Sequence, residues 1–188
     1  MKWAVFMDRD GTVNEEVGYL DDPAGLRLLP GAGEAIRRLN AARVPVLLVT
    51  NQSAIARGYL PAARLQAVHQ ELARQLAAHG AHIDHIYHCP HHPDENCSCR
   101  KPQPGMLQQA AAEHGIELAD SFIVGDKGTD LEAGRRVGCR TVLVLTGYGP
   151  DERRRLETAG PRPDFVARDL SEAVEWILTR QREEAGDD

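Results

Sequence analysis

The sequence has no long apolar stretch. Its apolar runs all stop well short of the roughly 20 residues that a membrane-spanning helix requires. The run at residues 3–7 is short and meets Asp8 at once, which is not the form of a secretory signal. We therefore expect a cytoplasmic protein that does not associate with a membrane.

Clusters of positive charge are also missing. The net charge is −6, and lysine and arginine form no long tract. Because nucleic acids are bound mainly through clustered cations, we expect no nucleic-acid partner. Lysine itself is rare: only Lys2, Lys101 and Lys127 occur, and every other cation is arginine. Where lysine is kept, we expect its compact ammonium to be needed.

The chain contains no repeat, linker or low-complexity segment. Its 188 residues suit one domain with a buried core, and 42% apolar with 27% charged residues is typical of a globular protein. We predict a single domain over residues 1–180, with a metal-binding loop at 89–99. The charged segment 181–188 is expected to be a frayed tail.

Apolar runs typical of strands alternate with segments of helical spacing. Strands are predicted at residues 3–7, 44–49, 83–88, 121–124, 141–145 and 165–166. Helices are predicted at residues 32–42, 61–80, 104–114, 130–137 and 170–178. This alternation predicts an α/β fold with a doubly wound, mainly parallel sheet. Ligands of such sheets bind at the carboxyl ends of the strands, where Asp8, Thr50 and Asp126 occur.

An acidic motif, Asp8-Arg9-Asp10-Gly11-Thr12, follows the first predicted strand. Two carboxylates at this spacing, on a turn opened by Gly11, can converge on one site. One can attack phosphorus while the other transfers protons. A bare Asp-x-Asp would be more typical of a loop that caps the next segment. The full motif, directly after a buried strand, favours catalysis.

Two other strands end in polar residues. Thr50-Asn51-Gln52-Ser53 offers a hydroxyl and amides to phosphate oxygens, although such residues are common in ordinary turns. Gly125-Asp126-Lys127-Gly128-Thr129-Asp130 offers Asp126 as an oxygen ligand for magnesium. Asp130 suits either the site or a helix N-cap, and the two interpretations are equally supported.

Together, these motifs resemble the haloacid dehalogenase superfamily of phosphatases over nearly the whole chain. The resemblance implies that Asp8 forms an aspartyl-phosphate and that Asp10 protonates the leaving oxygen and then activates water. It also implies that Thr50 and Lys101 steady the phosphoryl group. Magnesium would be held by the Asp8 carboxylate, the Asp10 backbone carbonyl and Asp126. Since two carboxylates and a phosphate dianion repel one another, magnesium and Lys101 would nearly neutralise the site.

Three of the four cysteines lie within eleven residues, in a loop that also contains histidine. Cysteines clustered in a cytosolic protein indicate metal binding before disulfides. A Cys₃His set suits a closed, structural zinc site. The ligands would be Cys89, Cys97 and Cys99 with His91, which the resemblance to the family's Cys-x-His pattern favours. His92 is the fallback ligand, and Cys139 is expected to be an ordinary buried thiol. The zinc loop would hold Arg100 and Lys101 over the phosphate.

The loop preceding Arg100-Lys101-Pro102 is similar to that of two branches of the superfamily. These are the heptose bisphosphate 7-phosphatases of bacterial heptose synthesis and the histidinol-phosphate phosphatases. Four segments resemble the first branch more closely: Gly18-Tyr19, Ile55-Ala56-Arg57-Gly58, Cys89-Pro90-His91-His92-Pro93 and Pro104-Gly105-Met106. This resemblance implies that substrate is contacted by Glu16, Val17, Gly18, Tyr19, Asn51, Gln52, Ser53, Arg100 and Lys127.

We therefore expect a monomer without a cap domain that acts on a small sugar phosphate. The guanidinium of Arg100 would bind the second phosphate of a bisphosphate. A zinc-stabilised phosphate-binding module without catalysis is the alternative from another class.

Overall fold

Six parallel strands form one sheet in the order β3-β2-β1-β4-β5-β6. The structure is a computed structural model that describes residues 2–160 and 162–186. The strands are β1 (Val5–Met7), β2 (Val46–Asn51), β3 (His85–Cys89), β4 (Phe122–Gly125), β5 (Arg140–Val144) and β6 (Phe165–Ala167). The predicted doubly wound α/β fold is confirmed.

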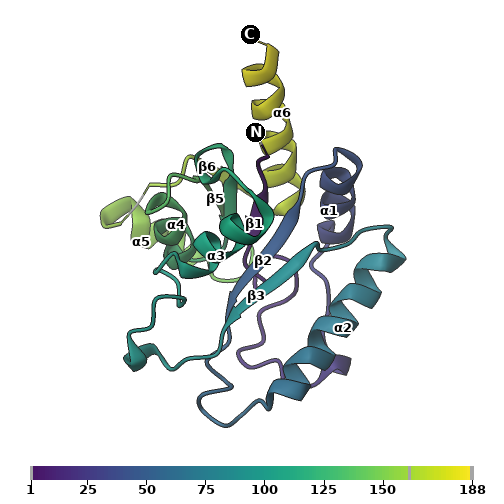
Figure 1. The fold of residues 1–188 in the computed structure, drawn as a ribbon, viewed down its shortest axis with the longest axis vertical. Coiled ribbons are helices and arrows are strands. Elements are labelled where there is room, and N and C mark those ends of the chain that lie inside the picture. The colour runs from purple at the N-terminus through teal and green to yellow at the C-terminus, as the bar shows by residue number, and fades with distance from the viewer. Residues whose placement is uncertain (1, 161, 187–188) are drawn as a thin grey trace.

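Helices connect the strands on both faces of the sheet (Figure 1). They are α1 (Ala32–Ala41), α2 (Ala62–Ala78), α3 (Gly105–His114), α4 (Gly128–Arg135), α5 (Gly149–Thr158) and α6 (Leu170–Gly186). Helix α5 is not among the helices predicted from the sequence. Its start nevertheless carries helix signals, because Pro150 stands in the first turn with Asp151 and Glu152.

The central strands are buried on both faces, which explains why β1 and β4 read as continuous apolar runs. The edge strand β3 instead exposes His85 and His88. Side chains of a strand alternate between faces. Val5 and Met7 of β1 therefore join a core with α1, α2 and α6, while Phe6 joins a second core with α3 and α4. Leu156 of α5 extends this second face over β5.

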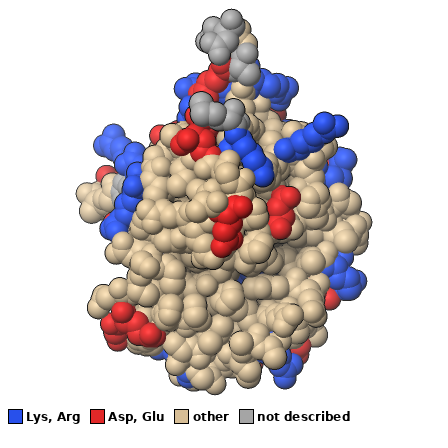
Figure 2. Space-filling view, in the orientation of Figure 1, with Lys and Arg blue, Asp and Glu red and all other residues tan. Residues whose placement is uncertain are grey.

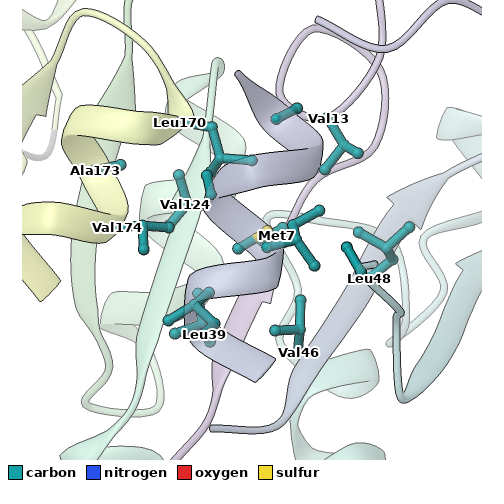
Figure 3. Close-up of a cluster of buried hydrophobic side chains, with 14 of the residues drawn as sticks. Met7, Val13, Leu39, Val46, Leu48, Val124, Leu170, Ala173 and Val174 are labelled. Carbon is teal, nitrogen blue, oxygen red and sulfur yellow. The ribbon is translucent and has the colours of Figure 1, made fainter. Parts of the chain in front are cut away.

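Figure 3 shows how the first core is filled. Met7 lies at its centre, between the strand residues and Leu39 of α1. Leu170, Ala173 and Val174 of α6 close it on one side. All five side chains are at most 2% exposed, so the central strand, and the loop that follows it, are firmly anchored.

The C-terminal helix is longer than expected. The sequence analysis predicted a frayed tail from residue 181, but α6 continues to Gly186. Glu184 pairs with Arg140 at 2.7 Å and with Arg180 at 3.1 Å, which gives the last turns tertiary and local partners. Residues 187 and 188 lie outside the described residues, and the domain division at residue 180 stays a prediction.

Charges are dispersed over the surface. In Figure 2, basic and acidic side chains lie along the outline of one face and across its upper half. Many of them form local pairs, such as Arg37 with Glu34 and Arg136 with Glu132. None of the helices among residues 2–160 and 162–186 combines the length and the apolar character needed to cross a membrane.

Candidate active site

A cavity of about 780 Å³ lies at the carboxyl ends of the strands. The loop between β3 and α3, which extends outward in Figure 1, contributes part of its wall. Its lining includes most of the residues selected from the sequence: Asp8, Asp10, Glu16, Gly18, Tyr19, Thr50, Asn51, Gln52, Ser53, Cys97, Arg100, Lys101, Lys127 and Asp130. Chain segments far apart in the sequence therefore meet at one place.

The Lys101 ammonium lies buried at the floor of the cavity. Its Nζ atom is 2.9 Å from Asp8 Oδ1 and 2.5 Å from Asp130 Oδ1, and it donates to the Val49 carbonyl at 2.6 Å. Burial alone would lower the pKa of Lys101, but Asp130 and Asp8 outweigh it and raise that pKa. Lys101 is therefore a fixed positive charge beside the predicted nucleophile.

Asp126 is close to Asp8 and is fully buried. One carboxylate oxygen each of Asp8, Asp126 and Asp130 lie within 4.8 Å of one another. Burial, together with the charges of Asp8 and Asp130, raises the pKa of Asp126 to about 8. Crowded carboxylates in a low-dielectric site demand a neutralising charge.

The oxygens of Asp126 fit a divalent cation. Oδ2 accepts a hydrogen bond from the Tyr148 backbone N–H at 2.9 Å, whereas buried Oδ1 has no hydrogen-bond partner. Magnesium prefers such oxygen ligands. The neighbouring backbone is close: a Cβ at Gly11, whose φ is +82°, would collide with the Asp126 carboxylate. Glycine is therefore required in the acidic motif by space as well as by conformation.

Asp130 combines the two interpretations that the sequence left open. It lies in the first turn of α4, where its Oδ2 accepts a hydrogen bond from the Lys127 N–H at 3.1 Å. Its Oδ1 pairs with Lys101. Burial raises the pKa of Asp130 to about 6 against the opposing effect of Lys101. The residue thus ties the helix start to the cation at the cavity floor.

The residues that follow β2 are mostly engaged by protein groups. The side chain of Asn51 donates to the Lys101 carbonyl and accepts from the Lys101 N–H, both at 3.1 Å. Gln52 Nε2 donates to Thr50 Oγ1 at 2.9 Å and to Asp10 Oδ2 at 3.0 Å. Ser53 lines the cavity. Asn51 and Gln52 therefore position other site residues, which spacing in the sequence could not reveal.

The first loop forms another wall of the cavity. Glu16 Oε2 pairs with Lys127 Nζ at 3.0 Å, and Glu16 Oε1 accepts from the Gly18 N–H at 2.7 Å. Tyr19 and Gly18 line the cavity, whereas Val17 is 52% exposed and is not among the lining residues. The predicted segment thus reaches the site through three of its four residues.

Tyr148 is a cavity residue that sequence reasoning missed. Its ring lies 4.5 Å from Lys127 Nζ, a cation–π contact. Acidic neighbours, led by Asp126, raise the pKa of Lys127 against the effect of burial. Lys127 therefore stays charged at the wall of the cavity, between Glu16 and the Tyr148 ring.

Arg9 was quoted from the sequence only as part of a motif, yet it is a buried cation, 1% exposed. Its guanidinium pairs with Asp10 at 2.7 Å and contacts His69 Nε2 on α2 at 3.4 Å. Burial, followed by the charges of Arg9 and His88, lowers the pKa of His69 to about 3. His69 is thus a neutral acceptor, although the sequence offered no partner for it.

The low pKa of His69 predicts that the folded protein loses stability in acid. Because the folded-state pKa of His69 lies below the ordinary value of about 6.5, only the unfolded chain takes up this proton between pH 6.5 and 3. The contribution of His69 to stability is therefore complete above pH 6.5 and is lost as the pH falls. From pH 6.5 to 4.5, wild type should lose up to about 2.5 kcal/mol more unfolding free energy than His69→Gln.

Urea denaturation at several pH values measures this difference. His82→Gln is the matched control because it removes an exposed histidine, 65% accessible. Parallel pH dependences of wild type and His69→Gln would contradict the buried, neutral state of His69.

The structure gathers the four predicted zinc ligands. Cys97 Sγ lies 3.5 Å from both Cys89 Sγ and Cys99 Sγ, and His91 Nδ1 lies 3.2 Å from Cys99 Sγ. These sulfur atoms are too far apart for a disulfide of about 2.05 Å. Ligand atoms around a tetrahedral zinc, with bonds of about 2.3 Å to sulfur, are about 3.7 Å apart. The donor set and its spacing therefore fit zinc.

Other members of the loop have different partners. His92 Nδ1 accepts from the Asp94 N–H at 3.4 Å, at the start of a short 3₁₀ turn, and the fallback ligand is thus outside the cluster. Cys139 is buried in the second core. Arg100 follows the cluster, and its guanidinium donates to the His91 carbonyl at 3.5 Å.

Comparisons with known proteins agree with this site. The family model of HAD-hydrolase-like proteins matches residues 98–173. The D-glycero-D-manno-heptose-1,7-bisphosphate 7-phosphatase of Thermosynechococcus vestitus is 42% identical over 187 residues, covering 94% of this chain and 95% of that protein. The D-glycero-beta-D-manno-heptose-1,7-bisphosphate 7-phosphatase of Pseudomonas aeruginosa is 44% identical over 93% of this chain and 97% of its own length.

A solved structure is similar over the same extent. The D,D-heptose 1,7-bisphosphate phosphatase of B. bronchiseptica, complexed with magnesium and phosphate, superposes with a TM-score of 0.88. It is 39% identical and is matched over 96% of this chain and 99% of that one. The chain therefore belongs to the haloacid dehalogenase-like phosphatases and, within them, to the heptose-1,7-bisphosphate 7-phosphatase family.

Proposed function

We propose that this enzyme hydrolyses the 7-phosphate of D-glycero-D-manno-heptose 1,7-bisphosphate, in bacterial heptose synthesis. One observation carries the proposal. A buried carboxylate, Asp8, contacts the Lys101 ammonium at the floor of a cavity, and two further cations, Arg100 and Lys127, line the same cavity. A bisphosphate needs one such arrangement for the reacting phosphate and another charge for the distant one. The named relatives act on this class of substrate.

The chain supplies the groups for a two-step transfer. A carboxylate oxygen of Asp8 attacks phosphorus, the bond from phosphorus to the sugar oxygen breaks, and Asp10 gives that oxygen a proton. Water then attacks the phosphorus of the aspartyl-phosphate and passes a proton to Asp10, which regenerates Asp8. Lys101 and Thr50 hold the phosphoryl oxygens. Magnesium, held by Asp8, the Asp10 carbonyl and Asp126, would supply charge neutralisation at the phosphoryl group.

The proposal also covers the second metal, the oligomeric state and the location of the enzyme. A structural zinc held by Cys89, His91, Cys97 and Cys99 stabilises the loop that carries Arg100 and Lys101. The enzyme works as a monomer in the cytoplasm on a soluble sugar phosphate, without a nucleic-acid or membrane partner.

Release of phosphate from three compounds tests the activity. Heptose bisphosphate, histidinol phosphate and a generic phosphate ester are compared with magnesium present. The proposal requires the highest kcat/KM for the bisphosphate. Faster turnover of histidinol phosphate would identify that compound as the substrate instead. If none of the three compounds is hydrolysed, the protein is a binding module without catalysis.

Arg100→Ala is expected to reduce kcat/KM selectively. Loss of a charged hydrogen bond costs about 1.5–3 kcal/mol, roughly a ten- to more than hundredfold loss for the bisphosphate. The generic ester, which has no second phosphate, should be hydrolysed nearly as before. Steady-state kinetics on both substrates measure the difference.

Two further variants serve as controls for Arg100→Ala. Arg74→Ala removes an arginine that is 70% exposed on α2, and it should change neither substrate. Lys101→Ala should impair both, because its contact strengthens as charge develops during transfer. Equal losses on both substrates with Arg100→Ala would contradict a role in recognising the second phosphate.

A further inference from the structure

Arg9 is the largest fully buried side chain in the described part of the protein. A buried guanidinium is costly unless each of its donors finds a partner. Arg9 Nη1 contacts His69, while Nε and Nη2 are directed at the carboxylate of the adjacent residue, Asp10. The guanidinium of Arg9 therefore forms its ion pair with Asp10.

The Asp10 carboxylate is surrounded by donors. Oδ1 accepts from Arg9 Nε at 3.0 Å, from Arg9 Nη2 at 2.8 Å and from Asn14 Nδ2 at 2.9 Å. Oδ2 accepts from Arg9 Nη2 at 2.7 Å and from Gln52 Nε2 at 3.0 Å. We call Arg9, Asn14 and Gln52 the donor ring. It fixes both the position and the plane of the carboxylate, because a guanidinium binds in a fork of fixed geometry.

The two catalytic carboxylates have different cations. Asp8, which attacks, contacts the compact ammonium of Lys101, whereas Asp10, which transfers protons, contacts the planar fork of Arg9. A compact ammonium leaves a carboxylate oxygen of Asp8 free to turn and bond to phosphorus. The planar guanidinium of Arg9 instead fixes the orientation of the whole Asp10 carboxylate. Two carboxylates thus receive two roles from their surroundings.

Gln52 links the donor ring to the phosphate site. Its Nε2 atom donates to Asp10 Oδ2 and also to Thr50 Oγ1, the hydroxyl assigned to the phosphoryl group. The position of Asp10 is therefore tied to the place where the phosphoryl group binds.

We propose that Arg9 is a positioning residue that holds Asp10 ready for proton transfer, assisted by Asn14 and Gln52. The inference rests on the proposed roles of Asp8 and Asp10. When Asp10 gives its proton to the leaving oxygen, its carboxylate becomes charged. The donor ring stabilises that developing charge at the moment when it forms.

The leaving group provides the test. An alkyl phosphate leaves as an alkoxide and needs a proton, whereas 4-nitrophenyl phosphate leaves as a stable anion and does not. Arg9→Met preserves the length of the side chain but removes the fork. In single-turnover experiments, Arg9→Met should slow the first step by about a hundredfold for the alkyl phosphate, which is a typical contribution of general acid catalysis.

The nitrophenyl ester should lose less than tenfold, and KM for either substrate should change by less than twofold. Arg9→Lys restores the charge without the fork, so it should recover only part of the alkyl phosphate rate. Arg74→Met, on an exposed arginine, is the matched control. Equal losses on the two leaving groups, or a loss confined to KM, would overturn the proposal.

A second variant decides the question if Arg9→Met does not fold. Asn14→Ala removes one neutral donor from Asp10 Oδ1 and keeps the buried ion pair. It should show the same selective loss, smaller in size. Equal effects on the two esters would overturn the proposal. Because both esters are generic, a wrong assignment of the sugar substrate would leave this leaving-group comparison unaffected.

Discussion

Asp8→Asn is expected to reduce turnover by at least about a thousandfold, the scale of losses seen when a catalytic nucleophile is removed. Asparagine keeps the size of the side chain, but its neutral amide cannot attack phosphorus to form the aspartyl-phosphate. Phosphate release under saturating substrate and magnesium measures the loss. Rapid quenching followed by mass spectrometry should detect phosphorylated Asp8 in the wild type alone.

The fold should survive this substitution. Lys101 keeps Asp130 and the Val49 carbonyl as partners. The charge of Asp8 is one cause of the raised pKa of Asp126, so removing it relieves repulsion between buried carboxylates. The unfolding midpoint without magnesium should therefore stay the same or rise. Turnover above a few per cent of wild type would contradict the covalent mechanism, once deamidation back to aspartate has been excluded by mass.

Local patterns were sufficient to predict the sheet. The central strands β1, β2 and β4 are buried almost throughout, so their sequences are mainly apolar, and the strand class could be assigned without knowing their neighbours. Strand order could not be predicted in this way. It depends on where each crossover returns to the sheet, and the sequence analysis named no order for the six strands.

The candidate site was largely predictable because parallel strands bring their carboxyl ends together. Asp8, Thr50 and Lys101 meet at one cavity although they are far apart in sequence. The direction of each polar side chain was not predictable. Gln52 and Asn51 were expected to face substrate, yet their amides bond to Asp10 and to the Lys101 backbone. Hydrogen bonds between distant segments decide such directions.

Arg9 illustrates the same limit. Its position inside an acidic loop suggests a solvated charge, but α2 covers the loop and places His69 beside the guanidinium. Tyr148 could not be selected from the sequence because no motif around it indicates that its ring contacts Lys127. The cation–π contact forms only when the β5–α5 turn reaches the start of α4.

Cys97→Ser is expected to remove bound zinc and to lower stability substantially. The wild type, purified without chelators, should contain close to one zinc per chain. If the concentration of free zinc is about a thousand times its dissociation constant, zinc binding adds about 4 kcal/mol to the unfolding free energy. Cys97→Ser should lose most of this, because the site then lacks one thiolate. Metal analysis and thermal unfolding measure the two effects.

Cys139→Ser is the matched control. It makes the same chemical change at a buried cysteine of the second core, outside the cluster. This variant should keep its zinc and its turnover, even if the buried hydroxyl lowers its unfolding midpoint. Loss of zinc from both variants would point to general destabilisation instead of a specific ligand.

Zinc loss should also reach the active site through the short path from Cys99 to Lys101. Arg100 donates to the carbonyl of His91, and Lys101 is held by Asn51 through two backbone hydrogen bonds. Without the metal, Lys101 keeps its contacts with Asn51, Asp130 and the Val49 carbonyl, but the loop that leads to it loses its anchor. Hydrogen exchange should therefore rise over residues 97–104, and kcat should fall even at temperatures where Cys97→Ser stays folded. Zinc-free wild-type protein, or full turnover in a zinc-free variant, would contradict a structural metal that positions Lys101.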